Sequence, residues 1–249
     1  MKRYIFGNWK TYKNIKEVKD FFSVLNKAKL TKTQDVVFGV APVFVYLSLA
    51  NELKRSECLV AAQDANYVMN KANTGTVSYE QLKDIGVKHV IVGHSERRKL
   101  FHESDEMINQ KVKTLLENKM TPILCIGETL KQYEKKQTKN VLRRQLQKDL
   151  KEIDSALFKN LIIAYEPVWA IGTGKTASSE IAQDAIAYVR EVLARLSSDA
   201  VAKKVPILYG GSVTPDNVSE LLAQKDINGA LVGGASLDPQ KFIQLIEAN

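Results

Sequence analysis

The fold follows from the stretch Leu161-Ile162-Ile163-Ala164-Tyr165-Glu166 and from the way its pattern recurs along the chain. Five apolar residues run together without alternation and end at a carboxylate, with Pro167 next. A continuous apolar run of this length indicates a parallel strand that is covered on both faces. Further along, apolar residues recur at helical spacing over residues 181–192, which predicts a helix after the strand.

Short runs of the same character predict eight strands in all, at residues 3–6, 36–40, 59–61, 89–92, 123–126, 161–164, 207–209 and 230–232. Each is followed by a stretch with helical spacing. Eight strand–helix units most economically close into a (β/α)8 barrel, an α/β fold with eight parallel strands and surrounding helices. The length suits one domain over residues 1–249.

An open, doubly wound sheet is the alternative architecture. Against it, the first strand ends in Gly7-Asn8-Trp9-Lys10, which lacks the glycine fingerprint of a dinucleotide-binding turn. Two dipeptides place a capping oxygen before a proline, Thr214-Pro215 and Asp238-Pro239, and each predicts the start of a helix.

Composition excludes several classes of protein. The 249 residues are 45% hydrophobic and 26% charged, which is typical of a globular protein. The apolar stretch near the start is too short for a secretion signal, and no apolar run approaches a membrane helix. Cys58 and Cys125 lie in apolar runs, which indicates buried thiols in a reducing compartment. We therefore expect a cytoplasmic protein without membrane contact.

The net charge of +8 leaves nucleic acid and small anions open as partners. The densest basic stretch, residues 131–144, mixes lysine and arginine with polar and acidic residues in a helical pattern. That mixture favours a solvated helix face over a nucleic-acid site.

Polar and glycine residues gather where the predicted strands end. They are Asn8, Lys10, Gln63, His94, Ser95, Glu96, Glu128, Glu166, Ser212, Gly233 and Gly234. In a barrel these ends converge on one face, the face that carries active sites. Residues far apart in sequence are therefore expected to be neighbours.

Three of these side chains suggest acid–base chemistry. Glu166 emerges from an apolar run, a setting that suits a general base, although it could equally cap a backbone amide. His94 begins a helical turn, whose N-terminus favours a neutral imidazole able to polarise a carbonyl, although a structural histidine is the plainer interpretation. Lys10 could attract an anion and stabilise negative charge, or be an ordinary surface lysine.

Three glycine-bearing loops, residues 171–174, 210–212 and 233–234, could bring backbone N–H groups close to phosphate, although isolated glycines usually only form turns. The sequence contains neither metal-ligand spacing nor an acyl-transfer serine motif, so we expect no metal and no cofactor. What remains is acid–base work on a phosphorylated substrate.

Taken together, these residues and motifs resemble those of the triosephosphate isomerase family, and the resemblance covers essentially the whole length of the chain. The matching segments are Gly7-Asn8-Trp9-Lys10, Val92-Gly93-His94-Ser95-Glu96-Arg97-Arg98, Ile123-Leu124-Cys125-Ile126-Gly127-Glu128, residues 164–175, Tyr209-Gly210-Gly211-Ser212-Val213 and residues 231–237. The resemblance implies a TIM barrel that interconverts dihydroxyacetone phosphate and glyceraldehyde 3-phosphate through an enediol.

The resemblance also implies roles for individual residues. Lys10, His94 and Glu166 would be catalytic, and Asn8, Lys10, Gly172, Ser212, Gly233 and Gly234 would bind substrate. Ser95, Glu96 and Thr74 would support them. The closing lid would comprise Pro167, Val168, Trp169, Ala170, Ile171, Gly172, Thr173, Gly174, Lys175 and Thr176.

A homodimer is the last expectation. Residues 64–78 are too long for a simple strand–helix connection, and in the resembling family this loop enters the neighbouring subunit. Two alternatives of function stay open: an aldolase that uses Lys10 as a Schiff base, and a non-catalytic basic protein that binds nucleic acid.

Overall fold

The computed structural model describes residues 1–68, 72–171 and 177–248. Its sheet is a closed barrel of parallel strands in chain order, with the last strand pairing with the first. The strands are β1 (Arg3–Asn8), β2 (Val36–Ala41), β3 (Cys58–Ala62), β4 (His89–Val92), β5 (Thr121–Ile126), β6 (Ile162–Tyr165), β7 (Ile207–Tyr209) and β8 (Gly229–Val232). The predicted barrel is thus confirmed, and no strand end differs by more than two residues from the expectation.

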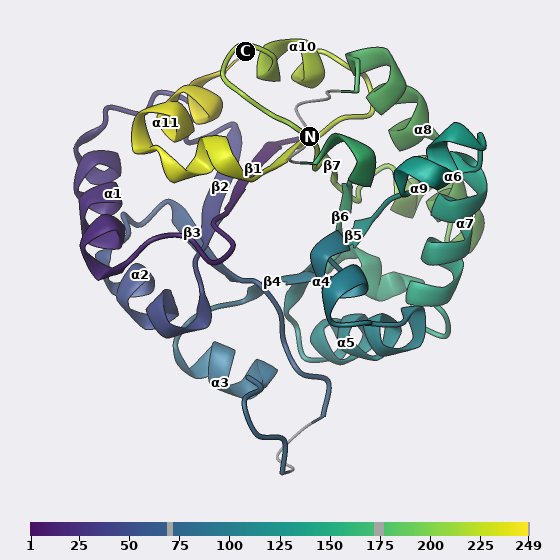
Figure 1. Ribbon diagram of the computed structural model, residues 1–249, viewed down its shortest axis with the longest axis horizontal. Helices are drawn as coiled ribbons and strands as arrows, with labels where there is room; N and C mark the ends of the chain where they lie inside the picture. The colour runs from purple at the N-terminus through teal and green to yellow at the C-terminus, as the bar shows by residue number, and fades with distance from the viewer. Residues whose placement is uncertain (69–71, 172–176, 249) are drawn as a thin grey trace.

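Helices form a ring around the barrel (Figure 1). They are α1 (Ile15–Lys27), α2 (Leu47–Leu53), α3 (Tyr79–Asp84), α4 (Ser95–Leu100), α5 (Asp105–Glu117), α6 (Leu130–Glu134), α7 (Thr138–Asp149), α8 (Ser179–Leu196), α9 (Asp199–Ala202), α10 (Val218–Leu222) and α11 (Pro239–Glu247). Short 3-10 turns are η1 (Phe44–Tyr46), η2 (Ser155–Asn160), η3 (Val168–Ala170) and η4 (Gly234–Leu237). None of the helices within the described ranges could cross a membrane.

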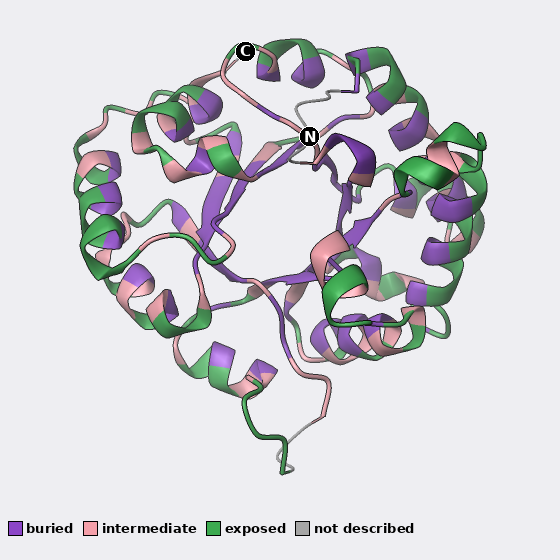
Figure 2. Ribbon diagram, viewed as in Figure 1, coloured by how far each residue is buried: buried purple, intermediate pink, exposed green. Residues whose placement is uncertain are grey.

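The sheet is buried on both sides, as its continuous apolar runs predict. Figure 2 shows buried strands and helices that are buried only on their inward faces. One core cluster fills the barrel interior and includes Phe6, Ile91 and Leu208, and the other lies between sheet and helices. In that outer layer the Trp9 ring meets Phe21 of α1 edge-on, with centroids 4.7 Å apart.

Strand pairing is uneven around the barrel. β1 and β2 pair along their whole length, from Arg3–Val36 to Asn8–Ala41. β7 and β8 share one register pair, Tyr209–Ala230, and Asn228 N donates to Ile207 O at 2.8 Å just before β8 begins. The carboxyl ends of all strands nevertheless open at the same face, which is where the polar residues were expected.

One of the two proline-based helix starts is confirmed and the other is wrong. Asp238 caps α11 by accepting from the N–H groups of Gln240 and Lys241, with Pro239 in the first turn. After Thr214-Pro215 the chain instead makes a turn, because the Asn217 side chain accepts from Thr214 N at 2.9 Å, and α10 begins only at Val218.

Candidate active site

Glu166 follows β6 directly and lies against the inner wall of the barrel mouth. Its backbone N–H donates to Ile126 O at the end of β5, 2.7 Å away. Its carboxylate accepts a hydrogen bond from Ser95 N at 3.0 Å, and its Oε1 lies 3.1 Å from His94 Nε2. Only 2% of the residue is exposed, so this carboxylate is almost fully withdrawn from water.

His94 caps α4, and its hydrogen bonds define its tautomer. Nδ1 accepts from Glu96 N at 3.2 Å, so that nitrogen carries no proton. A neutral imidazole then holds its proton on Nε2, which faces Glu166 Oε1. The ring is therefore arranged as a hydrogen-bond donor toward the barrel mouth.

Lys10 supplies the cation of the site from a left-handed backbone conformation with φ 51°. This conformation costs about 1–3 kcal/mol in a non-glycine residue. It is held by hydrogen bonds from Lys10 N to Asn8 Oδ1 at 3.0 Å and from Gln63 Nε2 to Lys10 O at 2.7 Å. Lys10 Nζ lies 2.5 Å from Glu96 Oε1, which steadies the ammonium beside His94.

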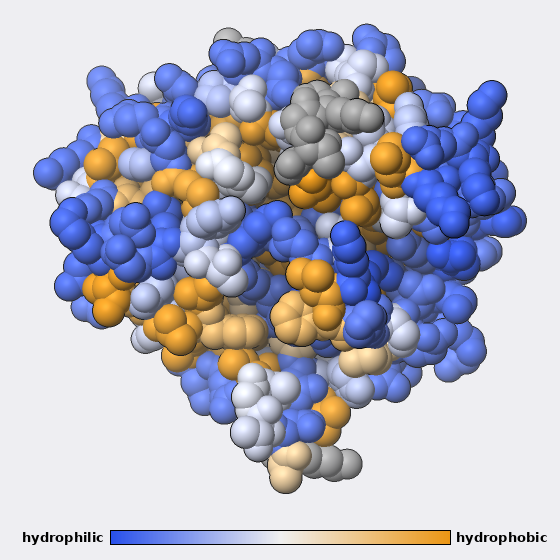
Figure 3. Space-filling model, viewed as in Figure 1, coloured by the Kyte–Doolittle hydropathy of each residue, from blue (hydrophilic) through white to orange (hydrophobic). Residues whose placement is uncertain are grey.

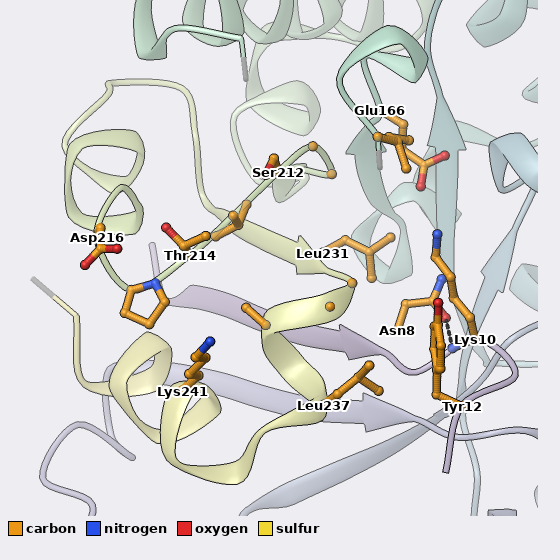
Figure 4. Close-up of a pocket in the computed structure, with 18 of the residues that line it drawn as sticks. Asn8, Lys10, Tyr12, Glu166, Ser212, Thr214, Asp216, Leu231, Leu237 and Lys241 are labelled. Carbon is orange, nitrogen blue, oxygen red and sulfur yellow. Dashed lines mark hydrogen bonds between the residues drawn. The ribbon is translucent and has the colours of Figure 1, made fainter. Parts of the chain in front are cut away.

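These side chains surround a cavity of about 600 Å³, within the usual range for a small-molecule site. Figure 4 shows Lys10 reaching toward Glu166 at one side, with Ser212 nearby and Lys241 and Asp216 at the far side. Gly233 and Gly234 also line it, and a Cβ added at Gly234 would meet nothing within 4 Å. Their backbones are therefore open to a ligand in the cavity.

The structure brings most of the predicted site residues together. Asn8, Lys10, His94, Glu166, Ser212, Gly233 and Gly234 all line the cavity, and Ser95 and Glu96 contact its side chains. Thr74 does not line the cavity: it is an exposed turn residue of the loop that precedes α3. Gly172 and residues 173–176 of the expected lid lie outside the described residues.

The first half of the expected lid is described. Pro167 precedes η3, and Ile171 lines the cavity. The Trp169 indole donates to Glu128 Oε1 at 2.8 Å, which fixes this segment to the end of β5.

Sequence reasoning gave no role to Glu128 and Gln63, although both stand at strand ends. Glu128 is completely buried, and burial raises the pKa of its carboxyl above the ordinary value. It accepts from both Trp169 and Tyr165. A charged residue after a buried strand was the available signal for Glu128, whereas the hold of Gln63 on Lys10 is visible only in three dimensions.

Among the residues that the structure describes, no group of three or more histidine, cysteine or acidic side chains is arranged to hold a metal ion. The chemistry that the described side chains offer is that of a buried carboxylate, a neutral imidazole and an ammonium around one cavity. That set can move protons next to a carbonyl and stabilise the resulting oxyanion.

Comparison with known proteins agrees with this chemistry. The family model described as "Triosephosphate isomerase" matches residues 3–249. A triosephosphate isomerase of Mycoplasmoides gallisepticum is 82% identical, with 100% of this chain and 98% of the relative covered. Those of Fusobacterium nucleatum and Mycoplasma pneumoniae are 47% and 46% identical, each over 98% of this chain and over 97% and 98% of the relative. The chain belongs to the triosephosphate isomerase family.

Proposed function

We propose that Glu166, His94 and Lys10 carry the reaction of this triosephosphate isomerase, the interconversion of dihydroxyacetone phosphate and glyceraldehyde 3-phosphate without metal or organic cofactor. The observation that carries the proposal is the His94 Nε2–Glu166 Oε1 contact of 3.1 Å at the cavity wall. It places a proton acceptor and a proton donor side by side, as transfer between adjacent carbon and oxygen atoms requires.

In this mechanism Glu166 removes a proton from the carbon next to the substrate carbonyl. His94 donates from Nε2 to the carbonyl oxygen, and the neutral imidazole is a role already described for this family. Lys10 stabilises the negative charge that develops in the enediolate. His94 then takes the proton of the other hydroxyl back onto Nε2 while Glu166 returns its proton to the former carbonyl carbon, which completes the isomerisation and restores both residues.

The phosphate group is assigned to the loops after β7 and β8. Ser212 would donate through its hydroxyl, and Gly233 and Gly234 through their backbone N–H groups. Barrels commonly hold phosphate at these two loops. The resemblance adds Gly172 and the lid, residues 167–176, which would cover the substrate and exclude water.

A coupled dehydrogenase assay with each triose phosphate tests the activity directly. We expect turnover in both directions, and folded protein that turns over neither substrate would refute the assignment. Borohydride trapping with substrate separates the aldolase alternative. We expect no covalent adduct on Lys10, because its amine is engaged in an ion pair with Glu96 at 2.5 Å.

We also propose that the chain works as a homodimer. The described parts of this loop, residues 64–68 and 72–78, project from the barrel (Figure 1). Asn66 joins its two sides, because its backbone N–H donates to Val77 O at 2.7 Å and it forms a β-bridge with Ser78. Exposed apolar side chains include Tyr12, Phe44, Val45, Leu100 and Phe101. Figure 3 shows apolar surface between the barrel mouth and the projecting loop. A second copy would cover such a surface.

A network of ion pairs holds the base of this loop. Asp64 accepts from Lys111 at 2.7 Å and from Arg97 at 2.9 Å, and Lys111 also contacts Glu103 at 2.6 Å. In the dimer, Thr74 would support Asn8 and Lys10 of the neighbouring subunit.

Both free cysteines are buried, which agrees with a cytoplasmic location as part of this proposal.

A further inference from the structure

The backbone turn after β5 supports the residue pair Glu166-Pro167 from both sides. Ile126 O accepts from Glu166 N at 2.7 Å. Glu128 O accepts from Val168 N at 3.1 Å. The residue between these two acceptors is Gly127, so the position of Gly127 determines where both anchors lie.

Gly127 also touches Glu166 directly. A Cβ added at Gly127 would lie 1.7 Å from Glu166 O and 2.6 Å from its carbonyl carbon. Nothing but hydrogen separates the two backbones, so a movement of Gly127 is transmitted to Glu166 without a flexible side chain to absorb it.

Gln145 of α7 holds Gly127 through both polar atoms of its side-chain amide. Gln145 Oε1 accepts from Gly127 N at 2.9 Å, and Gln145 Nε2 donates to Gly127 O at 3.3 Å. Only 7% of Gln145 is exposed. One buried side chain therefore pairs with the donor and the acceptor of one backbone residue, a two-point contact that fixes orientation as well as distance.

The surroundings of Gln145 indicate that it positions the turn at Gly127 as well as packing against it. It lines a cavity of about 290 Å³ together with Gly127, Ser95, Val168 and the back of Glu166. Space on this side of the base means that packing alone does not hold the turn in place. The two hydrogen bonds from Gln145 hold the turn where packing is absent.

We propose that Gln145 is a positioning residue for the isomerase reaction: it clamps Gly127 and, through it, the backbone of Glu166. The inference rests on the proposed role of Glu166 as the base. Gln145 does not line the active-site cavity, so it acts through Gly127 rather than on the substrate. Its effect is on the placement of the carboxylate relative to His94 and the substrate, where an error of about 1 Å can cost on the order of 100-fold in rate.

The clamp predicts a specific kinetic signature for Gln145→Met, which keeps the length of the side chain and removes both hydrogen bonds. We expect kcat to fall about 10- to 100-fold. KM should change little, because the phosphate loops follow β7 and β8 and do not contact Gln145. Substrate binding and base placement are therefore separated in this variant.

A matched control is available in Gln183 of α8. Its amide makes the same kind of two-point contact, accepting from Asp226 N at 3.0 Å and donating to Asp226 Oδ2 at 2.7 Å, and it does not line the active-site cavity. Gln183→Met should cost comparable stability in thermal unfolding and leave kcat unchanged. A kcat loss in Gln183→Met equal to that in Gln145→Met would overturn the proposal.

The deciding experiment is a double-mutant cycle on kcat in the full-length enzyme. If Gln145 acts through the base, Gln145→Met should cause little further loss in a Glu166→Gln background, because the group being positioned is gone. The same fractional loss in both backgrounds, or wild-type kcat in the single variant, overturns the clamp.

Should Gln145→Met not fold, Gln145→Glu retains the contact from Gly127 N and goes through the same cycle. Inactive wild type or a fully active Glu166→Gln enzyme would instead refute the proposed function.

Discussion

Adding a single methyl group at Gly127 should displace the base by pushing on the backbone of Glu166. In Gly127→Ala the new Cβ would lie 1.7 Å from Glu166 O, whereas real Cβ contacts are essentially never below 3.0 Å. The two backbones must separate by about 1.3 Å, and displacements near 1 Å cost on the order of 100-fold in rate. We therefore expect kcat to fall at least about 100-fold, with a stability loss of about 1–3 kcal/mol from overpacking.

The measurement is steady-state kcat and KM by the coupled assay, with thermal unfolding to establish the folded fraction. Gly86→Ala is the control, since Gly86 has φ +76° and lies at the end of α3, away from the cavity. It should lose stability through backbone strain and keep its kcat. A folded Gly127→Ala enzyme with kcat within about twofold of wild type would show that the contact does not govern base placement.

Other substitutions and a chemical probe test the remaining assignments. Glu166→Gln should keep the fold and substrate binding and lose roughly 10²- to 10⁴-fold in kcat, and near-normal kcat would remove this residue from the mechanism. Thr74→Arg should weaken association and activity together through a bulky buried charge, and a fully active wild-type monomer in sedimentation would contradict this. Burial raises the pKa of Cys58 to about 12 and that of Cys125 well above its ordinary value, so neither thiol of folded protein should react with a thiol reagent at pH 8, and prompt labelling would refute their burial.

The barrel was predictable because its strands are written in unbroken apolar runs. The apolar run at residues 161–165 must be buried on both faces of the sheet. Eight such strands are buried on both faces when helices surround a closed parallel barrel. Strand ends were less certain, since they depend on partners: β1 reaches Asn8 because Asn8 lies opposite Ala41. The mistaken helix start at Thr214-Pro215 has a similar cause, because the Asn217 side chain completes a turn there instead.

The polar groups of the site were placed correctly at strand ends, because parallel strands deliver their carboxyl ends to one face. Their supports could not be inferred. The left-handed backbone of Lys10 and the amide contact from Gln63 leave no mark in the local sequence. Gln145 lies on a helix of ordinary amphipathic pattern, and only the fold reveals that it faces Gly127.

The uneven strand pairing of the barrel indicates where the sheet would open locally. A closed ring lets no strand leave alone, so backbone amides in the sheet should exchange with solvent through shared opening rather than through fraying at an edge. The seam between β7 and β8, joined at Tyr209–Ala230, is the natural place for that opening. The loops proposed to hold phosphate, at Ser212 and Gly233, continue from these two strands. A ligand spanning both loops would hold together the strand interface with the fewest register pairs, so occupancy of the site would slow hydrogen exchange throughout the sheet.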